Sequence, residues 1–326
     1  MNILLFRIFR CMAGGLLSAA VAGGAAAAGY PAQPIKLVVP FAAGSAADIV
    51  CRILGEKLTG ALGQPVVVHN KPGASGIIGT REVASSAPDG YTVGYANVVT
   101  LAINQSLYPS LPYDARRQLV SVALIGKVQS ALVVRNGLPV KSVADLVAYA
   151  KQHPGQLSVG SAGNGSTGHL SAEWFGSLAQ VSIVHIPYKS AQQATQDLIG
   201  GRIDMLFDNL TSVAPHIAAG SVRALAVTGD VRAPSLPDLP TVADTVAGFK
   251  TEAWAGLVVP AGTPAAVVER LNTAVNAILA SPSVRDQLAT LAFEAATEPP
   301  QALFELAERE QRLWAEVIRV SGATSN

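Results

Sequence analysis

The sequence has 326 residues, half of them hydrophobic and 14% charged, and its formal net charge is +1. A chain of this length can form two domains with substantial cores. Its charge balance leaves no basic excess for binding nucleic acid or anionic lipid, so any selectivity for an anion must be local.

The first 28 residues have the pattern of a secretory signal peptide. Arg7 and Arg10 give it a positive start, residues 12–22 are apolar and small, and alanines at 26–28 offer a cleavage site. A membrane anchor is the alternative, but no segment reaches the ~20 apolar residues that a span needs. We therefore expect cleavage near Ala28 and a periplasmic location. Because the removed segment contains two of the 23 basic residues and no acid, 21 basic residues remain against 22 acidic ones.

Beyond residue 34, strand-like apolar runs alternate with helix-like runs through most of the chain. Apolar residues at 3.6 spacing predict helices, for example around residues 49–58 and 143–150. Several strand-like runs are apolar at every position, which is typical of a parallel sheet covered on both faces, and the alternation predicts an α/β fold. The predicted strands are residues 35–39, 66–68, 91–95, 121–125, 131–134, 157–159, 183–186, 203–207 and 224–227.

Two loops of small and polar residues each follow a predicted strand and precede a predicted helix. They are residues 41–48 and residues 161–169. The first turn of a helix leaves backbone N–H groups unpaired at the positive end of the macrodipole, and small residues let an anion approach these groups closely. We interpret both loops as anion cradles that together clamp a small anion across a crevice.

The C-terminal part of the chain is predicted to be helical. An N-cap and a proline at 263–264 start one long helix, and a proline pair at 299–300 starts another. Such helices usually pack back on an earlier domain. We therefore expect one lobe from residues 30–130 plus 253–326 and a second lobe from residues 131–252, with two chain crossings that make a hinge.

A dinucleotide-binding turn is an alternative interpretation of the second loop. Residues 163–168 read G-x-G-x-x-G, but no acid that could hold a ribose occurs between Glu173 and Asp197. The five histidines lack a tight metal-ligand spacing such as H-E-x-x-H. We expect neither a cofactor nor a metal site.

A serine hydrolase is a second alternative. Ser166 could act with His169 or His185 and with Asp208, but the nucleophile elbow requires glycine where the chain has Asn164. A serine in the first helical turn more often caps the helix or donates to a ligand. This alternative predicts esterase activity that is lost in Ser166→Ala.

Two acidic residues near the loops have two possible roles each. Asp48 lies four residues before Arg52 on a predicted helix and either pairs with it or contacts ligand. Asp208 follows the strand 203–207, at the end where α/β sheets place ligands, and is either structural or a ligand contact.

Several short motifs occur in a specific order along the chain. They are residues 34–41 (PIKLVVPF), 62–68 (LGQPVVV), 70–76 (NKPGASG), 87–92 (APDGYT), 161–166 (SAGNGS), 169–170 (HL) and 187–189 (PYK). With these motifs, essentially the whole mature chain resembles the periplasmic solute-binding receptors of tripartite tricarboxylate transporters, the Bug or TctC type.

The resemblance implies a periplasmic-binding-protein type II fold, in which two α/β lobes close on a ligand cleft. It implies a binding protein and not an enzyme, acting as a monomer that captures a small carboxylate and delivers it to a membrane permease; a sensor that does not serve transport is the alternative. The implied carboxylates are di- and tricarboxylates, amino acids and aromatic acids. The expected ligand-binding residues are Phe41, Ala43, Gly44, Ser45, Ala46, Asp48, Ser161, Ala162, Gly163, Asn164, Ser166, Thr167, His169, Tyr188 and Asp208.

The chain departs from the family pattern at two places. Residues 42–45 read Ala-Ala-Gly-Ser where the family usually has Pro-Pro-Gly-Gly, and Ser190 follows Tyr188-Lys189 where the family often has glycine. The first change adds a hydroxyl and removes two prolines. Both changes bear on ligand preference more than on the binding role.

Overall fold

The computed structural model describes residues 29–324, so the predicted signal peptide lies outside the described residues. Strands and helices alternate along most of the chain. The strands are β1 (Ile35–Val39), β2 (Val66–Asn70), β3 (Thr92–Asn97), β4 (Leu119–Val134), β5 (Leu157–Ser161), β6 (Ile183–Pro187), β7 (Met205–Asn209), β8 (Arg223–Val227), β9 (Glu252–Pro260) and β10 (Phe293–Ala295). The helices are α2 (Ala46–Leu62), α3 (Ile77–Ala84), the π-helix η1 (Val99–Ile103), α4 (Asn104–Leu107), α5 (Ala115–Gln118), α6 (Val143–Gln152), α7 (Thr167–Ala179), α8 (Ala191–Ile199), α9 (Leu210–Ala218), the 3₁₀-helix η2 (Val242–Asp244), α10 (Ala265–Ala280), α11 (Pro282–Ala289) and α12 (Ala302–Ser321).

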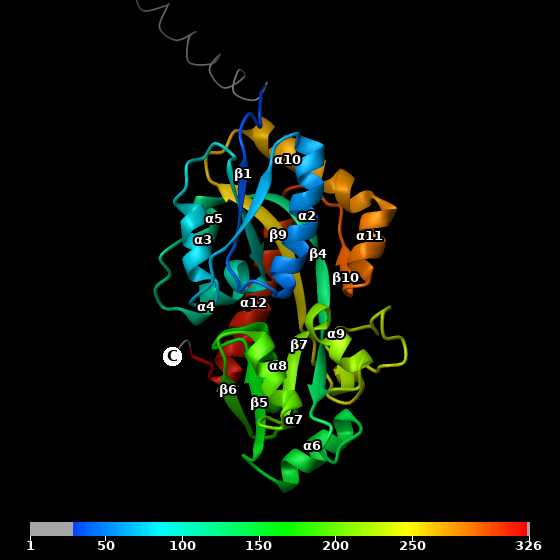
Figure 1. Ribbon diagram of the computed structural model, residues 1–326. Coiled ribbons are helices and arrows are strands. Elements are labelled where there is room, and N and C mark those ends of the chain that lie inside the picture. Colours follow the sequence, from blue (N-terminus) through cyan, green and yellow to red (C-terminus); the bar gives the residue numbers. More distant parts are fainter. Residues whose placement is uncertain (1–28, 325–326) are drawn as a thin grey trace, which may run out of the picture.

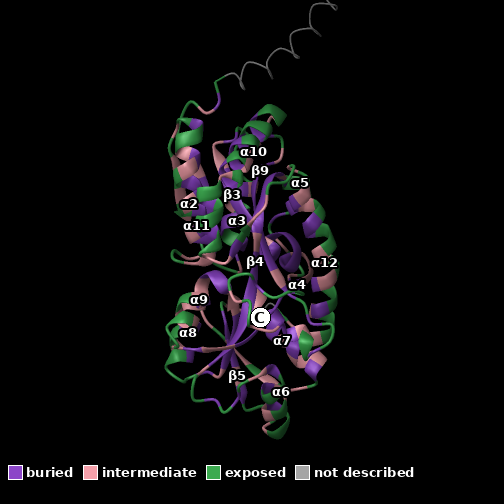
Figure 2. Ribbon diagram, turned by 90° about the vertical axis from the view of Figure 1, so that its right-hand side faces the viewer, coloured by how far each residue is buried: buried purple, intermediate pink, exposed green. Residues whose placement is uncertain are grey.

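The strands form one sheet in the order β2-β1-β3-β9-β4-β7-β5-β6, with β8 and β10 also paired to β4. In one half, β1 lies parallel between β2 and β3, and in the other half β5 lies parallel between β6 and β7. Helices cover both halves, and Figure 1 shows two lobes joined by the long β4. Figure 2 shows the buried strands at the centre and exposed faces on the outer helices. The predicted α/β fold with two lobes is confirmed.

Strand β4 joins the two lobes. Up to Gln129 it pairs with β9, and from Ser130 it pairs with β7 and β8. The sequence predicted two separate strands here, at 121–125 and 131–134, which is wrong. One continuous strand forms because residues 126–129 pair with β9 and Ser130 already pairs with β7, so pairing does not break between the two predicted strands. At Gly126 (φ 154°) a Cβ would stand 2.3 Å from the Glu294 backbone oxygen, so this close approach to β10 requires glycine.

Two strands of the sheet were not predicted. The central strand β9 pairs antiparallel with both β3 and β4, and the short β10 pairs with β4. Each lobe has a hydrophobic core. One cluster, which includes Leu132 and Phe249, belongs to the lower lobe in Figure 1, and a larger cluster centres on the upper lobe. Within residues 29–324, we find no helix with the length and apolarity to cross a membrane.

Helix α2 begins a few residues after the end of β1 and is capped at both ends. The Ser45 hydroxyl accepts a hydrogen bond from the Asp48 N–H (3.3 Å), and Gly63 in the left-handed region ends α2. Val50, Leu54 and Leu58 lie on its buried face. Cys51, the one cysteine among the described residues, is fully buried on the same helix, so its thiol is part of the core.

Candidate functional site

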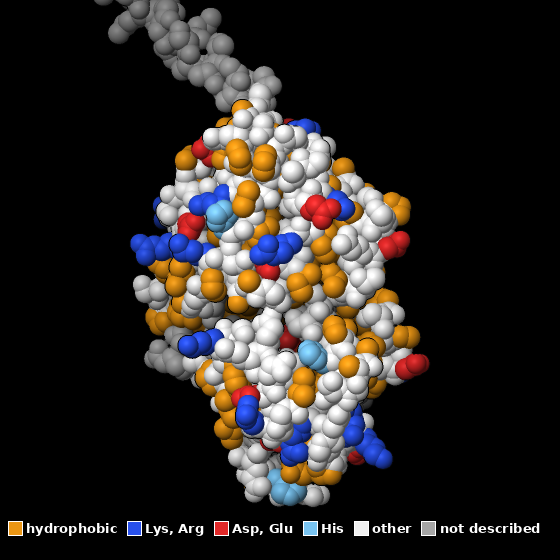
Figure 3. Space-filling model, viewed as in Figure 1, with side chains coloured by type: hydrophobic (Ala, Val, Ile, Leu, Met, Phe, Trp, Pro, Cys, Tyr) orange, Lys and Arg blue, Asp and Glu red, His pale blue; other side chains and the backbone are white. Residues whose placement is uncertain are grey.

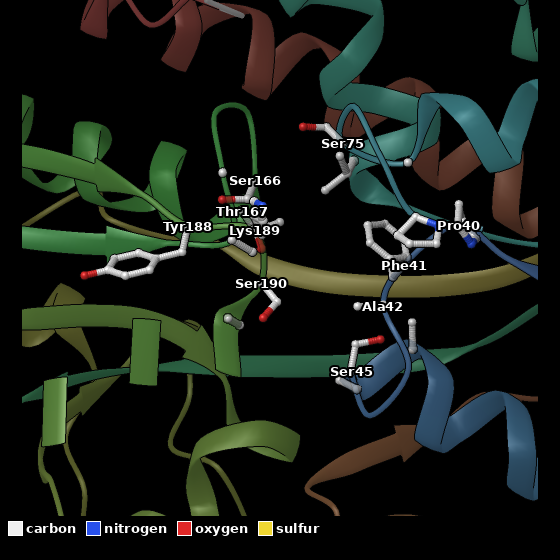
Figure 4. Close-up of a pocket in the computed structure, with 18 of the residues that line it drawn as sticks. Pro40, Phe41, Ala42, Ser45, Ser75, Ser166, Thr167, Tyr188, Lys189 and Ser190 are labelled. Atoms are coloured by element: carbon white, nitrogen blue, oxygen red, sulfur yellow. The ribbon is translucent and has the colours of Figure 1, made fainter. Parts of the chain in front are cut away.

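A cavity of about 810 Å³ lies between the two lobes. Its wall comes from residues at or just beyond the carboxyl ends of β1, β3, β5, β6 and β7 and from the loops that follow β1, β2, β5 and β6, which is where α/β folds place ligands. Figure 3 shows the hollow at the waist of the molecule, bordered mostly by uncharged atoms, and in Figure 4 the labelled side chains of the two lobes lie on opposite sides of it. The lining residues are Pro40–Ala42, Ser45–Ala47, Pro72–Gly76, Tyr95, Asn97, Val99, Tyr108, Ala162–Asn164, Ser166, Thr167, Pro187–Gln193, Asp208, Asn209 and Ser212.

Three helices with serine N-caps begin at the cavity. Their N-caps are Ser45 for α2, Ser166 for α7 and Ser190 for α8, and each hydroxyl accepts one backbone N–H of its helix. Other first-turn N–H groups remain without helical partners, and the positive ends of three macrodipoles converge on one space. The cavity can therefore hold negative charge without a cationic side chain at its centre. Among its lining residues, only Lys189 and Asp208 are charged.

Ten of the fifteen predicted ligand-binding residues line this cavity. The two predicted cradle loops therefore do face each other across a crevice. The ten are Phe41, Ser45, Ala46, Ala162, Gly163, Asn164, Ser166, Thr167, Tyr188 and Asp208.

The other five predicted residues do not form the cavity wall. Ala43 and Gly44 are exposed at the tip of the first loop, and Asp48, Ser161 and His169 are buried behind the two loops. Asp48 and His169 lie three residues after their N-caps, where the helix turns its side chains into the lobe. Ser161 is the last residue of β5, and its hydroxyl faces His185.

Asp48 organises the first loop from behind. Its carboxylate accepts hydrogen bonds from the Gly44 N–H (2.8 Å), the Asn70 amide (2.9 Å) and the Arg52 guanidinium (3.0 Å). Burial by itself raises the pKa of this carboxyl, but the donors from Arg52, Gly44 and Asn70 outweigh it and hold the pKa below its ordinary value. Of the two roles considered for Asp48, the structure shows the pairing with Arg52.

Replacing Asp48 with alanine is expected to lower the free energy of unfolding by about 3 kcal/mol at pH 7, because three charge-assisted hydrogen bonds are lost while Arg52 can return to water. A lowered pKa means that this contribution is present above the ordinary aspartate range and is lost as the pH falls through the lowered value. Urea unfolding at pH 7 and pH 3 measures both effects. Glu56→Ala, on the exposed face of the same helix, is the control and should change stability by less than about 0.5 kcal/mol. Equal losses in the two variants would contradict this role for Asp48.

A buried polar cluster supports the second loop. The Ser161 hydroxyl lies 2.6 Å from Nε2 of His185 and accepts the Gly163 N–H (3.1 Å), while Nδ1 of His169 accepts the Gly165 N–H (3.0 Å). The two imidazole rings are stacked with their centroids 3.9 Å apart. Burial, and then the neighbouring His169, lower the pKa of His185 to about 4, so this ring is neutral at physiological pH.

Asp208 lies at the end of β7, in the cavity wall. Its Oδ1 accepts the Asn209 N–H (2.8 Å), and its Oδ2 has no hydrogen-bond partner among the described residues and no exposed surface. Burial raises its pKa to about 7, only partly offset by the Asn209 donor. The protonated form of Asp208 is therefore well populated near neutrality.

Tyr188 and Lys189 follow β6 and border the cavity. The Tyr188 hydroxyl donates to Oδ2 of Asp197 (2.9 Å), so its polar end is engaged on α8. In Figure 4 the ring of Tyr188 extends away from the labelled residues of the opposite lobe. Tyr188 therefore contributes mainly apolar surface to the wall.

Sequence reasoning missed two further loops of the wall, residues 72–76 and the start of α8 at 190–193. The first contains Ala74 (φ 47°) and Ser75 (φ 50°), two successive non-glycine residues in the left-handed region. The motif at 70–76 marked this segment as family-like but did not indicate that it faces the cavity. For the segment 190–193, the pattern S-x-x-Q was a signal in the sequence that a capped helix begins there.

Two hydrogen bonds connect the lobes across the cavity mouth. The Ser75 hydroxyl donates to the Asn164 backbone oxygen (2.7 Å), and the Gln192 amide donates to the Gly44 backbone oxygen (2.7 Å). Each bond joins a loop of one lobe to a loop of the other. These two bonds hold the lobes in contact in this structure.

The site does not have the geometry of a serine hydrolase. Ser166 is the N-cap of α7, and its hydroxyl accepts the His169 N–H (3.3 Å). The serine that meets an imidazole is Ser161, which is 3% exposed and does not line the cavity. Among residues 29–324 no group of three or more His, Cys, Asp or Glu side chains is arranged to hold a metal ion.

The chain was compared with known proteins. Residues 50–323 match the model of the tripartite tricarboxylate transporter family receptor, TctC. Protein BugT of Bordetella pertussis is 36% identical over 311 residues, which cover 94% of this chain and 95% of BugT.

Three solved structures have closely similar folds. The R. palustris protein Rpa4515 with adipate has a TM-score of 0.88 at 37% identity, covering 90% of this chain and 99% of that one. MatC from Rhodopseudomonas palustris with bound malate has a TM-score of 0.84 at 31% identity, covering 89% and 100%. The periplasmic binding protein BugD has a TM-score of 0.84 at 34% identity, covering 90% of this chain and 99% of that one. The matched family consists of receptors and not of enzymes, so the hydrolase alternative is wrong. With its cavity between two lobes and a family match over most of its length, the chain belongs to the TctC family of tripartite tricarboxylate transporter receptors.

Proposed function

We propose that the protein is a periplasmic receptor that captures a small carboxylate in the cavity between its lobes and delivers it to a membrane permease. The observation that supports this most is the convergence of three helix N-termini on one cavity, with Ser45, Ser166 and Ser190 at the caps. The adipate and malate in the solved relatives support the ligand class.

The chemistry of the wall favours recognition by backbone amides and hydroxyls. A bidentate clamp for a carboxylate usually comes from arginine, and no arginine lines this cavity. Each charge-assisted hydrogen bond contributes about 1.5–3 kcal/mol net, so four or five contribute roughly 6–15 kcal/mol before ordering costs. Once ordering costs of a few kcal/mol are subtracted, the middle of this range corresponds to roughly micromolar binding.

In this proposal the two lobes move toward each other and close on the ligand. We take residues 30–130 with 253–326 as one lobe and 131–252 as the other, because β4 changes its partners at residues 129–130. The ligand contacts both lobes only when they are closed, so it stabilises the closed state through its own bonds. We further propose that the receptor acts as a monomer after cleavage near Ala28.

Isothermal titration against a panel of acids tests the function. The panel contains adipate, malate, a tricarboxylate, acidic amino acids and an aromatic acid, each beside its uncharged amide. At least one acid is expected to bind with micromolar affinity, and its amide at least 100-fold more weakly, because the helix N-termini favour negative charge. Folded protein that binds no acid below millimolar concentration would overturn the proposal. Loss of uptake of the same acid on deletion of the gene tests the transport role.

A further inference from the structure

We propose that His169 is a positioning residue that aims the peptide group between Asn164 and Gly165 at the opposite lobe, so that full closure requires its neutral imidazole. The proposal rests on the proposed function of the cavity. His169 itself does not line the cavity, and its effect on a ligand therefore passes through the loop.

The peptide group between Asn164 and Gly165 connects His169 to the opposite lobe through two hydrogen bonds. Its N–H, from Gly165, donates to Nδ1 of His169 within one lobe (3.0 Å), and its carbonyl, from Asn164, accepts the Ser75 hydroxyl of the other lobe (2.7 Å). In a planar trans peptide the N–H and C=O bonds point in opposite directions. An acceptor that holds the N–H toward α7 therefore turns the carbonyl toward the other lobe.

The contact around this peptide is tight. A Cβ on Gly165 would stand 2.2 Å from Cδ2 of Leu107, a residue of α4 in the opposite lobe, and Gly165 has φ of 74°. The neighbouring lobe therefore packs directly on the backbone here. A small rotation of the peptide changes both the hydrogen bond to Ser75 and the packing on Leu107.

The hydrogen bonds define the tautomer of His169. Because Nδ1 accepts the Gly165 N–H, the ring proton of the neutral form is on Nε2, which faces Oε1 of Glu173 at 3.6 Å. Protonation of the ring would place a second N–H against that of Gly165. The acceptor would be lost, and the carbonyl of Asn164 would no longer be held toward Ser75.

The titratable groups around this ring come from α7 itself and from the elements packed against it. Glu173 on α7 is the one group within ion-pair distance of His169 in the described part of the chain. His185 on β6 stacks on the ring and is neutral near pH 7. Strand β7 contributes Asp208, and β5 has no titratable residue. The charged residues of α12, which also packs on α7, are Glu305, Glu308, Arg309, Glu310, Arg312, Glu316 and Arg319.

The first test is the titration of the ligand-free protein by ¹⁵N NMR of the histidine rings. The wild type is expected to show the Nε2–H tautomer for His169 at pH 7.5, with the amide of Gly165 shifting as the ring is protonated. A proton on Nδ1 at pH 7.5, or a Gly165 amide that does not follow the ring, would overturn the proposal whether or not a ligand is known.

The second test compares affinities at pH 7.5 and 5.0 for whichever panel acid binds. Loss of the bond between the lobes is expected to weaken binding to the wild type by about tenfold at pH 5.0, the equivalent of about 1.4 kcal/mol. In His169→Asn the amide oxygen can take the place of Nδ1 but does not titrate. The ratio of affinities at the two pH values should therefore be several-fold smaller in this variant than in the wild type. The ligand and Asp208 are the same in the wild type and the variant, so the effect of their protonation on affinity cancels in the comparison of the two ratios.

A double-mutant cycle separates positioning from a general structural effect. His169→Leu removes the acceptor and Ser75→Ala removes the bond across the cavity mouth. If His169 acts through the peptide on Ser75, the double variant is expected to bind about as weakly as the weaker single variant. Fully additive losses, or a pH ratio in His169→Asn equal to that of the wild type, would overturn the proposal. If no acid binds the wild type at either pH, the proposed function fails, and the NMR titration still decides the role of His169.

Discussion

Replacing Ala46 with tryptophan is expected to reduce ligand affinity by at least 100-fold and to leave the fold intact. Ala46 is the first residue of α2 and lines the cavity, so an indole at this position occupies space that a ligand needs and covers first-turn N–H groups. The loss corresponds to about 2.7 kcal/mol or more. Tryptophan at Ser45 or Ser166 would be a less specific test, because each serine also caps its helix.

The control for this variant is Ala265→Trp. Ala265 is likewise the first residue of a helix, α10, but it is exposed and does not line the cavity. Titration of the panel acid that binds the wild type, with thermal unfolding of each variant, measures the effect. Comparable affinity in the two tryptophan variants would mean that the start of α2 does not contribute to the binding site.

Asp208→Asn is expected to stabilise the folded protein at pH 8 by about 2–4 kcal/mol. A shift of the Asp208 pKa from 3.8 to about 7 corresponds to roughly 4 kcal/mol for ionising this carboxyl in the folded state, and the start of α9 at the next residue offsets part of it. The asparagine retains an oxygen that can accept the Asn209 N–H. Because the folded pKa lies above the unfolded value, the destabilisation is absent below about pH 4 and complete above about pH 7.

Asp204, one residue before β7, provides a control because its pKa is shifted in the opposite direction. Burial raises the pKa of its carboxyl, but hydrogen bonds from Ser158 and Arg135 outweigh this and lower it. Asp204→Asn should therefore destabilise the protein at pH 7 and not at low pH. Urea unfolding of both variants and the wild type from pH 3 to pH 8 gives the pH dependence of each stability difference. A stability difference between Asp208→Asn and wild type that does not grow with pH would contradict the raised pKa.

The two cradle loops could be predicted from the sequence because each combines a strand end, small residues and a helix start within ten residues. These are local signals, and the structure brings the loops together across the cavity. Which first-turn residues face the cavity could not be predicted. Asp48 and His169 each lie three residues after their N-cap, and whether that position faces a ligand or the lobe depends on how the helix packs on the sheet.

The rest of the fold that was missed has a similar explanation. The apolar run of β4 does not reveal that its two halves pair with different lobes, and β9 finds its place between β3 and β4 only in the assembled sheet. The loop at 72–76 adopts left-handed conformations at Ala74 and Ser75 that residue type alone does not favour. Its position is set by contacts from elsewhere, including the Asn104 amide that donates to the Ser75 backbone oxygen (3.1 Å).

Helix α12 restricts how the receptor can open. It packs on η1 and α4 in one lobe and on α7 in the other, and Figure 2 shows it extending along both lobes. Its buried residues include Leu303 near one end and Trp314 and Val317 near the other. If the lobes open about β4, a helix of twenty residues packed on both of them has to slide along α7 or detach from it. We therefore expect α12 to limit how far the lobes separate, and a variant with a shortened α12 to open wider.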